Sequence, residues 1–221
     1  MIRQARPPTP KDFDDQVKDA RNVVRAAVAR DGKIESKKFN SYWWTKFKGD
    51  FEGTCGAKCG FCEGTPTAYA SLQVEHYRPK SGIAAILPAS PPAKIIRPRD
   101  RGHLTSVSEV GYWWLAYLWN NWLLACPICN GDYKGNLFPL SKAHVLPIAE
   151  GCESAEESLL LNPFDADDPL DHLDFSDDGL IAARNGSARG VATILTCGLD
   201  RFELMSARMT HALRVKELLD A

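Results

Sequence analysis

Apolar residues near both ends of the chain follow the spacing of amphipathic helices. In the first such segment they stand among charged residues, and Asp31-Gly32 ends the pattern. The apolar positions of this segment are Phe13, Val17, Val24 and Val28. A last helix is predicted over residues 200–219. Its expected inward face is formed by Phe202, Met205, Met209, Leu213 and Leu218.

The most apolar stretch of the chain runs from Tyr112 to Leu124 and carries four tryptophans. Asn120 and Asn121 interrupt it, and it is shorter than the roughly 20 residues that span a bilayer. We therefore predict a central helix that is buried in the protein and ends near Cys126. Its tryptophans are expected in the core rather than as platforms for stacking nucleic-acid bases.

Two regions have the composition of short strands. Leu72-Gln73-Val74 is predicted as a strand that leads into Glu75-His76. Further along, the segments 172–175 and 180–182 are joined through Asp178-Gly179, which favours a tight turn. These two segments predict a β-hairpin.

Residues 82–110 have the character of an insertion. Between Arg78 and Arg101 the chain holds six basic residues and one acidic residue, Asp100. The segment is predicted to lie outside the core, either as a solvated mobile loop, which is favoured, or as an arm that contacts DNA. The prolines expected to break any regular element in it are Pro88, Pro91, Pro92 and Pro98.

These elements predict an α+β protein with helical elaborations at both ends. A length of 221 residues suits one domain of ordinary size. We divide the chain into a helical segment over 1–52, a core over 53–142 that contains the insertion, and an acidic extension over 143–221 with the hairpin and helices.

Composition places the chain among globular proteins, since hydrophobic residues make up 44% and charged residues 25%. The net charge of -1 hides an uneven distribution. Residues 1–142 hold 21 Lys and Arg against 13 Asp and Glu, whereas residues 143–221 hold 6 against 15. A polyanion partner is therefore plausible for the first part only, and the acidic part suits docking to a protein.

The seven cysteines do not predict a secreted disulfide scaffold. Residues 1–11 are polar and rich in proline, without the apolar segment of a secretion signal. We expect a cytoplasmic protein with reduced thiols and no membrane span.

Four of the cysteines form two matched CxxC pairs, Cys59 with Cys62 and Cys126 with Cys129. Such pairs converge on one tetrahedral zinc ion, and four thiolates leave no open position for catalysis. The sequence therefore predicts a structural Zn2+ that joins the loop before the strand to the segment after the apolar stretch. Cys55 is a rival ligand, and a redox role or buried free thiols are the alternatives to zinc.

Between the two pairs lies Val74-Glu-His-Tyr-Arg-Pro-Lys80, followed by Asn121 and by Asn130 directly after Cys129. An acidic residue and His at a strand end, framed by CxxC pairs, resemble the HNH nucleases. The resemblance implies a zinc-stapled ββα-metal core and metal-dependent hydrolysis of phosphodiester bonds in DNA. Two positions depart from the usual pattern, because Glu75 stands where many members have Asp and Asn130 where they have a final His.

The resemblance also implies roles for individual residues. His76 is the expected general base, since a neutral imidazole accepts a proton at neutral pH. Glu75 is expected to coordinate Mg2+ or Mn2+ through oxygen, with Asn130 or Asn136 as a second ligand. Asn121 is expected to tie the loop that carries His76. Contacts with phosphate are expected from Arg78, Lys80 and Lys134.

A longer pattern is similar to the small HNH proteins of bacterial Septu-type anti-phage systems and related retron systems. It includes the segments 74–80, 111–130 and 133–140 and extends to 160–164 and 190–195. In that family the HNH protein works beside an ATPase of the ABC/SMC type, so the resemblance implies such a partner. Two other functions stay open: an HNH nuclease that cuts RNA, and a non-catalytic zinc adaptor that binds nucleic acid or protein.

Overall fold

The computed structural model describes residues 1–65, 70–86 and 104–220. Its α-helices are α1 (Phe13–Asp31), α2 (Tyr42–Cys55), α3 (Ala188–Cys197) and α4 (Phe202–Leu219). The strands form three antiparallel pairs: β1 (Gln73–His76) with β4 (Trp122–Ala125), β2 (Ile83–Ile86) with β3 (Leu104–Ser108), and β5 (Leu173–Phe175) with β6 (Ile181–Ala183). Short helical turns include η3 (Trp113–Leu115), η4 (Trp119–Asn121) and the π-helical η5 (Ile128–Lys134). The mixture agrees with the predicted α+β class.

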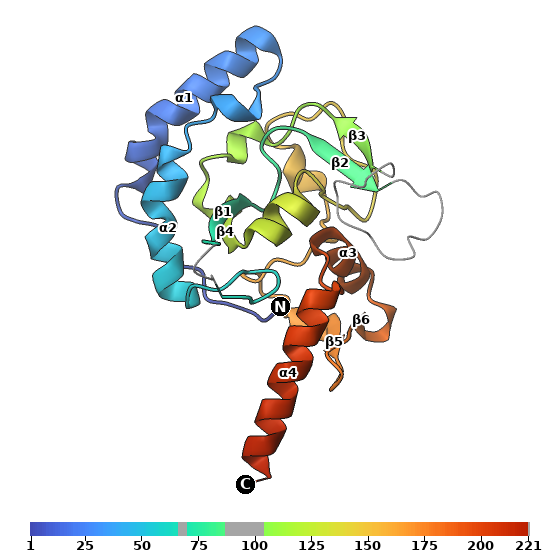
Figure 1. Cartoon of the computed structure of the whole chain (residues 1–221). Coiled ribbons are helices and arrows are strands. Elements are labelled where there is room, and N and C mark those ends of the chain that lie inside the picture. The colour runs from blue at the N-terminus through green and yellow to red at the C-terminus, as the bar shows by residue number, and fades with distance from the viewer. Residues whose placement is uncertain (66–69, 87–103, 221) are drawn as a thin grey trace.

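The β1–β4 pair lies in the middle of the molecule, with α1 and α2 along one side (Figure 1). In its register Glu75 is opposite Leu123, and His76 is opposite Trp122. The chain leaves β4 directly into η5, which forms the second CxxC turn. The centre of the fold is therefore a strand–strand–short helix unit with Glu75 and His76 at the end of its first strand.

Aromatic rings hold the two N-terminal helices against this unit. The Phe13 ring of α1 lies 5.0 Å from the Trp119 ring and 5.3 Å from the Trp122 ring, between centroids and edge-on. Phe47 of α2 lies 5.1 Å from Phe13 in a similar arrangement. Such pairs contribute about 0.5–1.5 kcal/mol each beyond the burial of their area. The helix predicted from Phe13 is confirmed, and it ends at Gly32, whose φ of 72° is left-handed.

The helix predicted over Tyr112–Leu124 is wrong. The structure forms η3 and η4 there, and the last part of the stretch is strand β4, buried at every position. An apolar run that is buried on both faces carries no helical period, and large aromatic residues favour strands. Pairing of β4 with β1 decides the outcome, because it satisfies the backbone groups of both strands. The prediction that Trp119 and Trp122 belong to the core is confirmed.

The expectation that residues 82–110 lack regular structure and lie outside the core is also wrong at their two ends, where Ile83 is buried in the core. Residues 83–86 and 104–108 pair as strands β2 and β3. The prolines fall between these strands in the sequence, so they interrupt neither. The prolines and the basic residues Lys94, Arg97, Arg99 and Arg101 lie outside the described residues.

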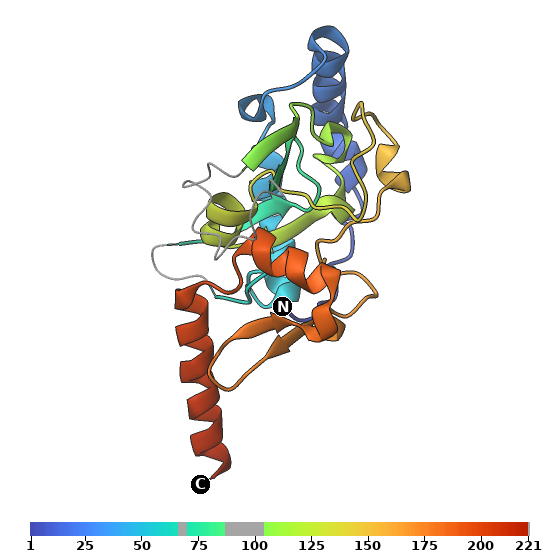
Figure 2. The same cartoon turned by 90° about the vertical axis from the view of Figure 1, so that its right-hand side faces the viewer.

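The hairpin predicted across Asp178-Gly179 is confirmed as β5 and β6. The final helix is confirmed as α4, but its expected inward face is wrong. The exposed fractions of Phe202 and Leu218 are 71% and 78%, and Met209 and Leu213 are exposed as well. Figures 1 and 2 show the reason, since α4 leaves the body of the molecule and only its first half lies beside the hairpin. Within the described residues, no helix has the length and apolar character needed to cross a membrane.

Candidate functional site

Alternation along β1 separates the two residues at its end. Glu75 lies on the face that β1 turns toward η5, together with Gln73 two residues earlier, and both contact η5 side chains. The His76 side chain projects from the opposite face, toward α2. The acidic group and the imidazole are therefore adjacent in sequence but have different surroundings.

Glu75 forms an ion pair with Lys134, the last residue of η5. The Nζ–Oε1 distance is 2.5 Å, and the lysine side chain is completely buried. Lys134 also donates a hydrogen bond of 2.8 Å to the carbonyl oxygen of His76. Lys134 was expected to contact phosphate, but the structure places it inside the site as the partner of Glu75.

His76 is held by the backbone carbonyl of Ala116. Its Nε2 atom lies 2.9 Å from that oxygen. A carbonyl oxygen has no proton to donate, so Nε2 carries the hydrogen and Nδ1 keeps the lone pair of the neutral ring. The indole nitrogens of Trp44 and Trp122 donate to the same oxygen, at 3.3 Å and 2.8 Å. This shared acceptor fixes the imidazole among aromatic rings.

The surroundings of His76 keep its imidazole neutral. The exposed fraction of the residue is 3%, and the Trp44 ring meets it edge-on at 4.8 Å between centroids. Burial lowers the pKa of His76 well below its usual value, and the positive charge of Lys80 lowers it further. A neutral imidazole with its lone pair on Nδ1 has the protonation state that a general base requires.

Lys80 brings a second cation to the site. Its Nζ lies 4.7 Å from the centroid of the Trp44 ring, which attracts the cation through its π-electrons. Burial lowers the pKa of Lys80, the negative charge of Glu75 opposes that effect, and Lys134 adds to it. The charges of Lys80 and Lys134 thus act on His76, and those of Glu75 and Lys134 act on Lys80.

Asn121 ties the chain that follows His76 to the segment before β4. Its Oδ1 accepts a hydrogen bond of 2.8 Å from the backbone nitrogen of Arg78, and its Nδ2 donates to the carbonyl of Arg78 at 3.1 Å. A third bond of 3.2 Å reaches the carbonyl of Leu115. All of these partners are backbone groups, so Asn121 fixes the chain at Arg78 against the segment before β4.

Arg78 was expected to bind phosphate, but its guanidinium is engaged within the protein. It forms an ion pair with Glu156, and the exposed fractions of the two side chains are 12% and 1%. The guanidinium carbon also lies 4.9 Å and 4.7 Å from the ring centroids of Tyr112 and Phe138. These contacts give Arg78 a structural role in joining the loop after β1 to the acidic part of the chain.

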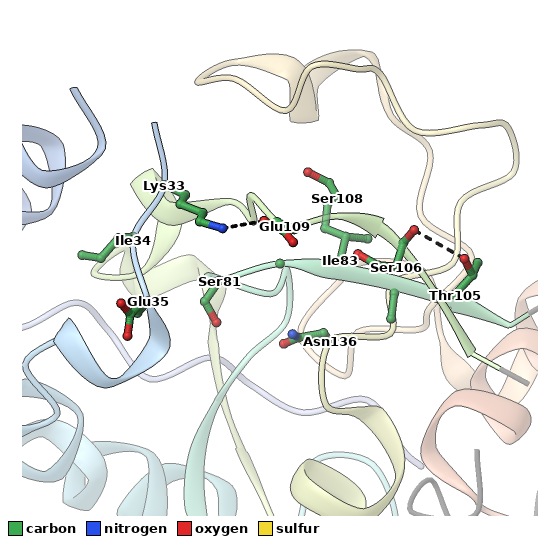
Figure 3. A pocket seen from close by; sticks show the side chains of 12 residues that line it. Lys33, Ile34, Glu35, Ser81, Ile83, Thr105, Ser106, Ser108, Glu109 and Asn136 are labelled. Atoms are coloured by element: carbon green, nitrogen blue, oxygen red, sulfur yellow. Dashed lines mark hydrogen bonds and ion pairs between the residues drawn. The ribbon is translucent and has the colours of Figure 1, made fainter. Parts of the chain in front are cut away.

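The two candidate amide ligands lie in different places. Asn130 is on η5, and its Nδ2 donates a hydrogen bond of 2.8 Å to Oε1 of Gln73, on the face of β1 that carries Glu75. Asn136 is exposed and lines a groove of about 390 Å³ beside β2 and β3 (Figure 3). Ser81 and Ser108 line the same groove. Neither Glu75 nor Asn130 lines this groove. Asn130 is therefore the better placed of the two to act with Glu75.

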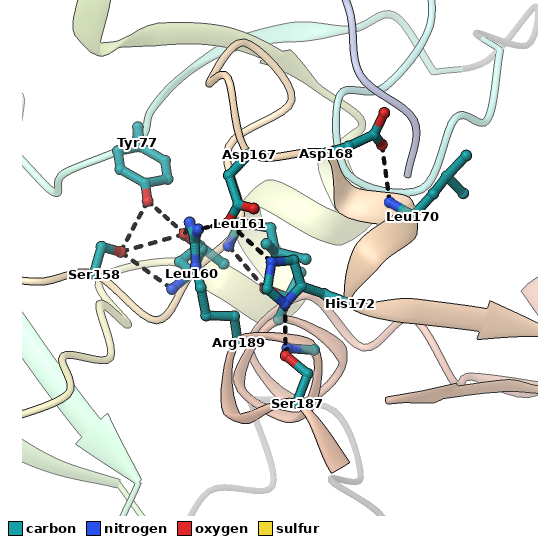
Figure 4. Close-up of polar contacts among 12 residues, drawn as sticks. Tyr77, Ser158, Leu160, Leu161, Asp167, Asp168, Leu170, His172, Ser187 and Arg189 are labelled. Atoms are coloured by element: carbon teal, nitrogen blue, oxygen red, sulfur yellow. Dashed lines mark hydrogen bonds and ion pairs between the residues drawn. The ribbon is translucent and has the colours of Figure 1, made fainter. Parts of the chain in front are cut away.

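A chain of polar contacts connects the loop after β1 with α3 (Figure 4). The Tyr77 hydroxyl donates to the carbonyl of Leu160 at 2.5 Å, and Arg189 reaches the same carbonyl at 3.4 Å. Arg189 pairs with Asp167, whose carboxylate lies 2.9 Å from Nε2 of His172. The Nδ1 atom of His172 is 2.6 Å from the hydroxyl of Ser187, which caps α3. The residue next to His76 is thus braced against the C-terminal part of the chain.

The four cysteines of the CxxC pairs come together as one cluster, with all sulfur atoms within 4.8 Å of one another. The first cysteine of each pair accepts a backbone N–H from the second, at 3.5 Å for Cys59 and 3.4 Å for Cys126. In the described part of the chain this is the one group of three or more His, Cys, Asp or Glu side chains close enough to share a metal ion. Cys55 stands apart, with its sulfur 3.9 Å from the carbonyl of Ala5.

The geometry of the cluster is compatible with zinc. Zn–S bonds of about 2.3 Å give a tetrahedron with edges of about 3.8 Å. The sulfur atoms of Cys62 and Cys126, which come from different pairs, are 3.8 Å apart. A hydrogen bond from Cys129 lowers the pKa of Cys126 to about 7, and one from Cys126 lowers the pKa of Cys62. The neighbouring thiols raise the pKa of Cys59 and Cys129, so two of the four thiols ionise more readily than a free cysteine and two less readily.

Three features of the site were not expected from the sequence: the carbonyl of Ala116, the edge of Trp44, and the pairing of Lys134 with Glu75. The first two depend on tertiary contacts that leave no local pattern. The pairing of Lys134 with Glu75 had a signal in the sequence. Asn130 and Lys134 are four residues apart in a helical segment and therefore lie on one face.

Comparison with known proteins identifies one informative relative. No family model matches the chain, and no solved structure matches it significantly. The chain is similar to Septu protein PtuB of Bacillus mycoides (strain KBAB4), with 35% identity over 170 residues. The match covers 77% of this chain and 52% of the relative, so the chain spans about half the length of that protein. Over most of its own length, the chain is therefore related to a Septu protein.

Proposed function

We propose that this protein is a metal-dependent HNH endonuclease that hydrolyses phosphodiester bonds of DNA in a Septu-type anti-phage defence system. The similarity to a Septu protein supports the system. The strand–strand–helix unit of β1, β4 and η5, with Glu75-His76 at the strand end and the cysteine cluster beside it, supports the nuclease.

The observation that carries the proposal is the hydrogen bond from His76 to the carbonyl of Ala116. It leaves Nδ1 as the basic atom of a neutral imidazole. In hydrolysis, Nδ1 takes a proton from water as the water oxygen attacks phosphorus, and the bond to the leaving 3′ oxygen breaks. The carbonyl of Ala116 then faces an imidazolium, whose positive charge strengthens the hydrogen bond that is already present.

Glu75 and Asn130 are the proposed protein ligands of a catalytic Mg2+ or Mn2+. The donor set fits, because carboxylate and amide oxygens suit these hard ions, which keep several waters as further ligands. Asn130 would use Oδ1, since its Nδ2 donates to Gln73. Such an ion stabilises the negative charge on the phosphate oxygens. Lys134 holds the carboxylate of Glu75 in position through a hydrogen bond to its Oε1 atom.

Lys80 is the proposed phosphate contact of the site. Lys80 is partly exposed, and burial lowers its pKa. A polyanion beside it would stabilise the charged form of this lysine. Arg78 is omitted from the binding surface because Glu156 already neutralises it.

The cysteine cluster is proposed to bind a structural Zn2+. Four thiolates would fill the tetrahedral coordination and leave no position for substrate or water. The ion would join the loop that precedes β1 to η5, which carries Asn130 and Lys134. In this way zinc would hold the two halves of the catalytic site at a fixed distance.

The resemblance that suggested a Septu nuclease also suggests an ABC/SMC-type ATPase as partner. The acidic part of the chain, residues 143–221, is the proposed docking side, since its carboxylates would repel DNA. A zinc adaptor without catalytic activity is the rival function. What favours the nuclease is the presence of Glu75 and His76 together with Asn121 and Asn130, a set that an adaptor has no reason to keep together.

The test is a cleavage assay with plasmid DNA and with RNA, in Mg2+, Mn2+ or chelator, alone and with any ATPase encoded beside the gene. We expect divalent-dependent cutting of DNA. If the protein cuts RNA but not DNA, the proposed substrate is RNA. A folded, zinc-loaded protein that cuts neither in any condition would establish the adaptor instead.

A further inference from the structure

The turn between α3 and α4 packs tightly against η5, the segment that carries Cys129. A Cβ atom at Gly198 would lie 2.0 Å from Cε1 of Tyr133, so the glycine backbone lies directly on that ring. Arg201 follows three residues later, immediately before α4. The structure thus places a cation from the C-terminal part of the chain beside the cysteine cluster.

Arg201 reaches the cluster itself. Its Nη1 atom lies 3.5 Å from the sulfur of Cys129 and donates at 2.9 Å to the carbonyl of Gly198 and at 3.3 Å to that of Cys197. The guanidinium carbon is 5.6 Å from the centroid of the Tyr133 ring. These contacts position the guanidinium from several sides, and the sulfur of the fully buried Cys129 is one of them.

Electrostatics explain what a cation does at this place. Four thiolates and one Zn2+ carry a net charge of -2, which is costly to hold in a partly buried site. A guanidinium 3.5 Å from the sulfur of Cys129 offsets part of this negative charge and favours the thiolate form that binds zinc.

We propose that Arg201 is the cation that stabilises the zinc-bound thiolate of Cys129 from outside the coordination sphere, and that it thereby raises the affinity of the cluster for zinc. The proposal rests on the zinc site proposed above. It also links the metal to the C-terminal helix, because the same guanidinium holds the end of α3 and precedes α4. Removing an outer partner of this kind typically weakens metal binding about 10- to 100-fold.

The test is zinc affinity of the full-length protein, measured by competition with a chromogenic chelator. Arg201→Gln removes the charge and is expected to weaken binding about 10- to 100-fold. Arg201→Lys keeps the charge without the planar fork and should fall between Arg201→Gln and the native protein. Arg214→Gln is the matched control, since it removes one positive charge from an exposed position of α4.

A second measurement separates this role from a general loss of stability. With Co2+ in place of zinc, the thiolate-to-metal charge-transfer band reports the donor strength of the sulfurs. We expect this band to shift in Arg201→Gln and not in Arg214→Gln. Native affinity and an unshifted band in Arg201→Gln, or equal losses in both variants, would overturn the proposal while the zinc site stands. A native protein that binds no zinc would overturn both.

Discussion

The imidazole Nε2 of His76 lies 2.9 Å from the carbonyl oxygen of Ala116, forty residues away in the sequence. This contact selects one tautomer and directs the basic lone pair to Nδ1. The indole groups of Trp44 and Trp122 donate to the same oxygen, so the acceptor is fixed from three directions. As the proposed general base, His76 held in this way would accept a proton without reorientation.

The stability of the protein should fall at mildly acidic pH because of His76. Its pKa is lowered in the folded state, so below the unfolded value of about 6.5 the unfolded chain binds a proton that the folded chain does not. The free energy of unfolding should therefore rise with pH through this range, by up to about 1.4 kcal/mol per pH unit. Urea unfolding at several pH values checks this.

The same experiment on His76→Gln isolates the residue. This variant should lose the steep part of the dependence, whereas His211→Gln, at an exposed position of α4, should keep it. If the native protein and His76→Gln respond to pH in parallel, the buried neutral imidazole is refuted.

Removing Arg78 should destabilise the protein strongly. Arg78→Ala leaves the carboxylate of Glu156 buried without its cation, which costs about 3–5 kcal/mol. Arg25→Ala breaks an ion pair with Glu150 in which both side chains are more than half exposed, so at most about 1 kcal/mol is expected there. Chemical denaturation compares the two variants. Equal losses would mean that Arg78 and Glu156 are more accessible to water than the structure shows.

Gly198 should tolerate no side chain. Its φ is 57°, and an added Cβ would overlap the Tyr133 ring. Gly32 provides a matched control, because its φ is 72° but nothing lies within 4 Å of an added Cβ. Gly32→Ala should cost about 1 kcal/mol from the backbone alone, and Gly198→Ala a further 1–3 kcal/mol or so from overpacking. Similar melting temperatures for the two variants would contradict the packing of the α3–α4 turn on η5.

Zinc binding should depend on the four cysteines of the cluster and not on the other cysteines of the chain. The native protein is expected to bind one zinc per chain, and Cys126→Ser should lose it and unfold at lower temperature. Cys55→Ser, whose sulfur lies outside the cluster, should keep both properties. Elemental analysis of the purified proteins checks the metal. Loss of zinc in Cys55→Ser would show that the proposed set of four cysteine ligands is wrong.

Local sequence signals predicted the elements that depend on local chemistry. The spacing of Phe13 and Val17 and the stop at Gly32 marked α1, and Asp178-Gly179 marked the hairpin of β5 and β6. The matched CxxC spacing predicted that four distant thiols would meet. Each of these signals is carried by residues close together in the chain or by a motif with known geometry.

Other parts of the fold depend on contacts that no local pattern reports. The last part of the apolar stretch, from Trp122, forms a strand because β1 pairs with it. The apolar side chains of α4 were expected to face inward, yet Phe202 and Leu213 are exposed, since an amphipathic pattern does not say whether a partner surface lies within the same chain. The roles of Lys134 and Arg78 likewise depended on Glu75 and Glu156, which pair with them across the fold.

Cleavage of plasmid DNA by His76→Gln tests the account most directly. The glutamine amide can still donate to the carbonyl of Ala116, so it preserves the contact while removing the base. With the divalent ion and the proposed ATPase partner present, we predict a loss of about 10²–10⁴-fold in rate, with zinc content unchanged and with native cutting by His211→Gln. Native cutting by a zinc-loaded His76→Gln would contradict the assignment of His76 as the general base.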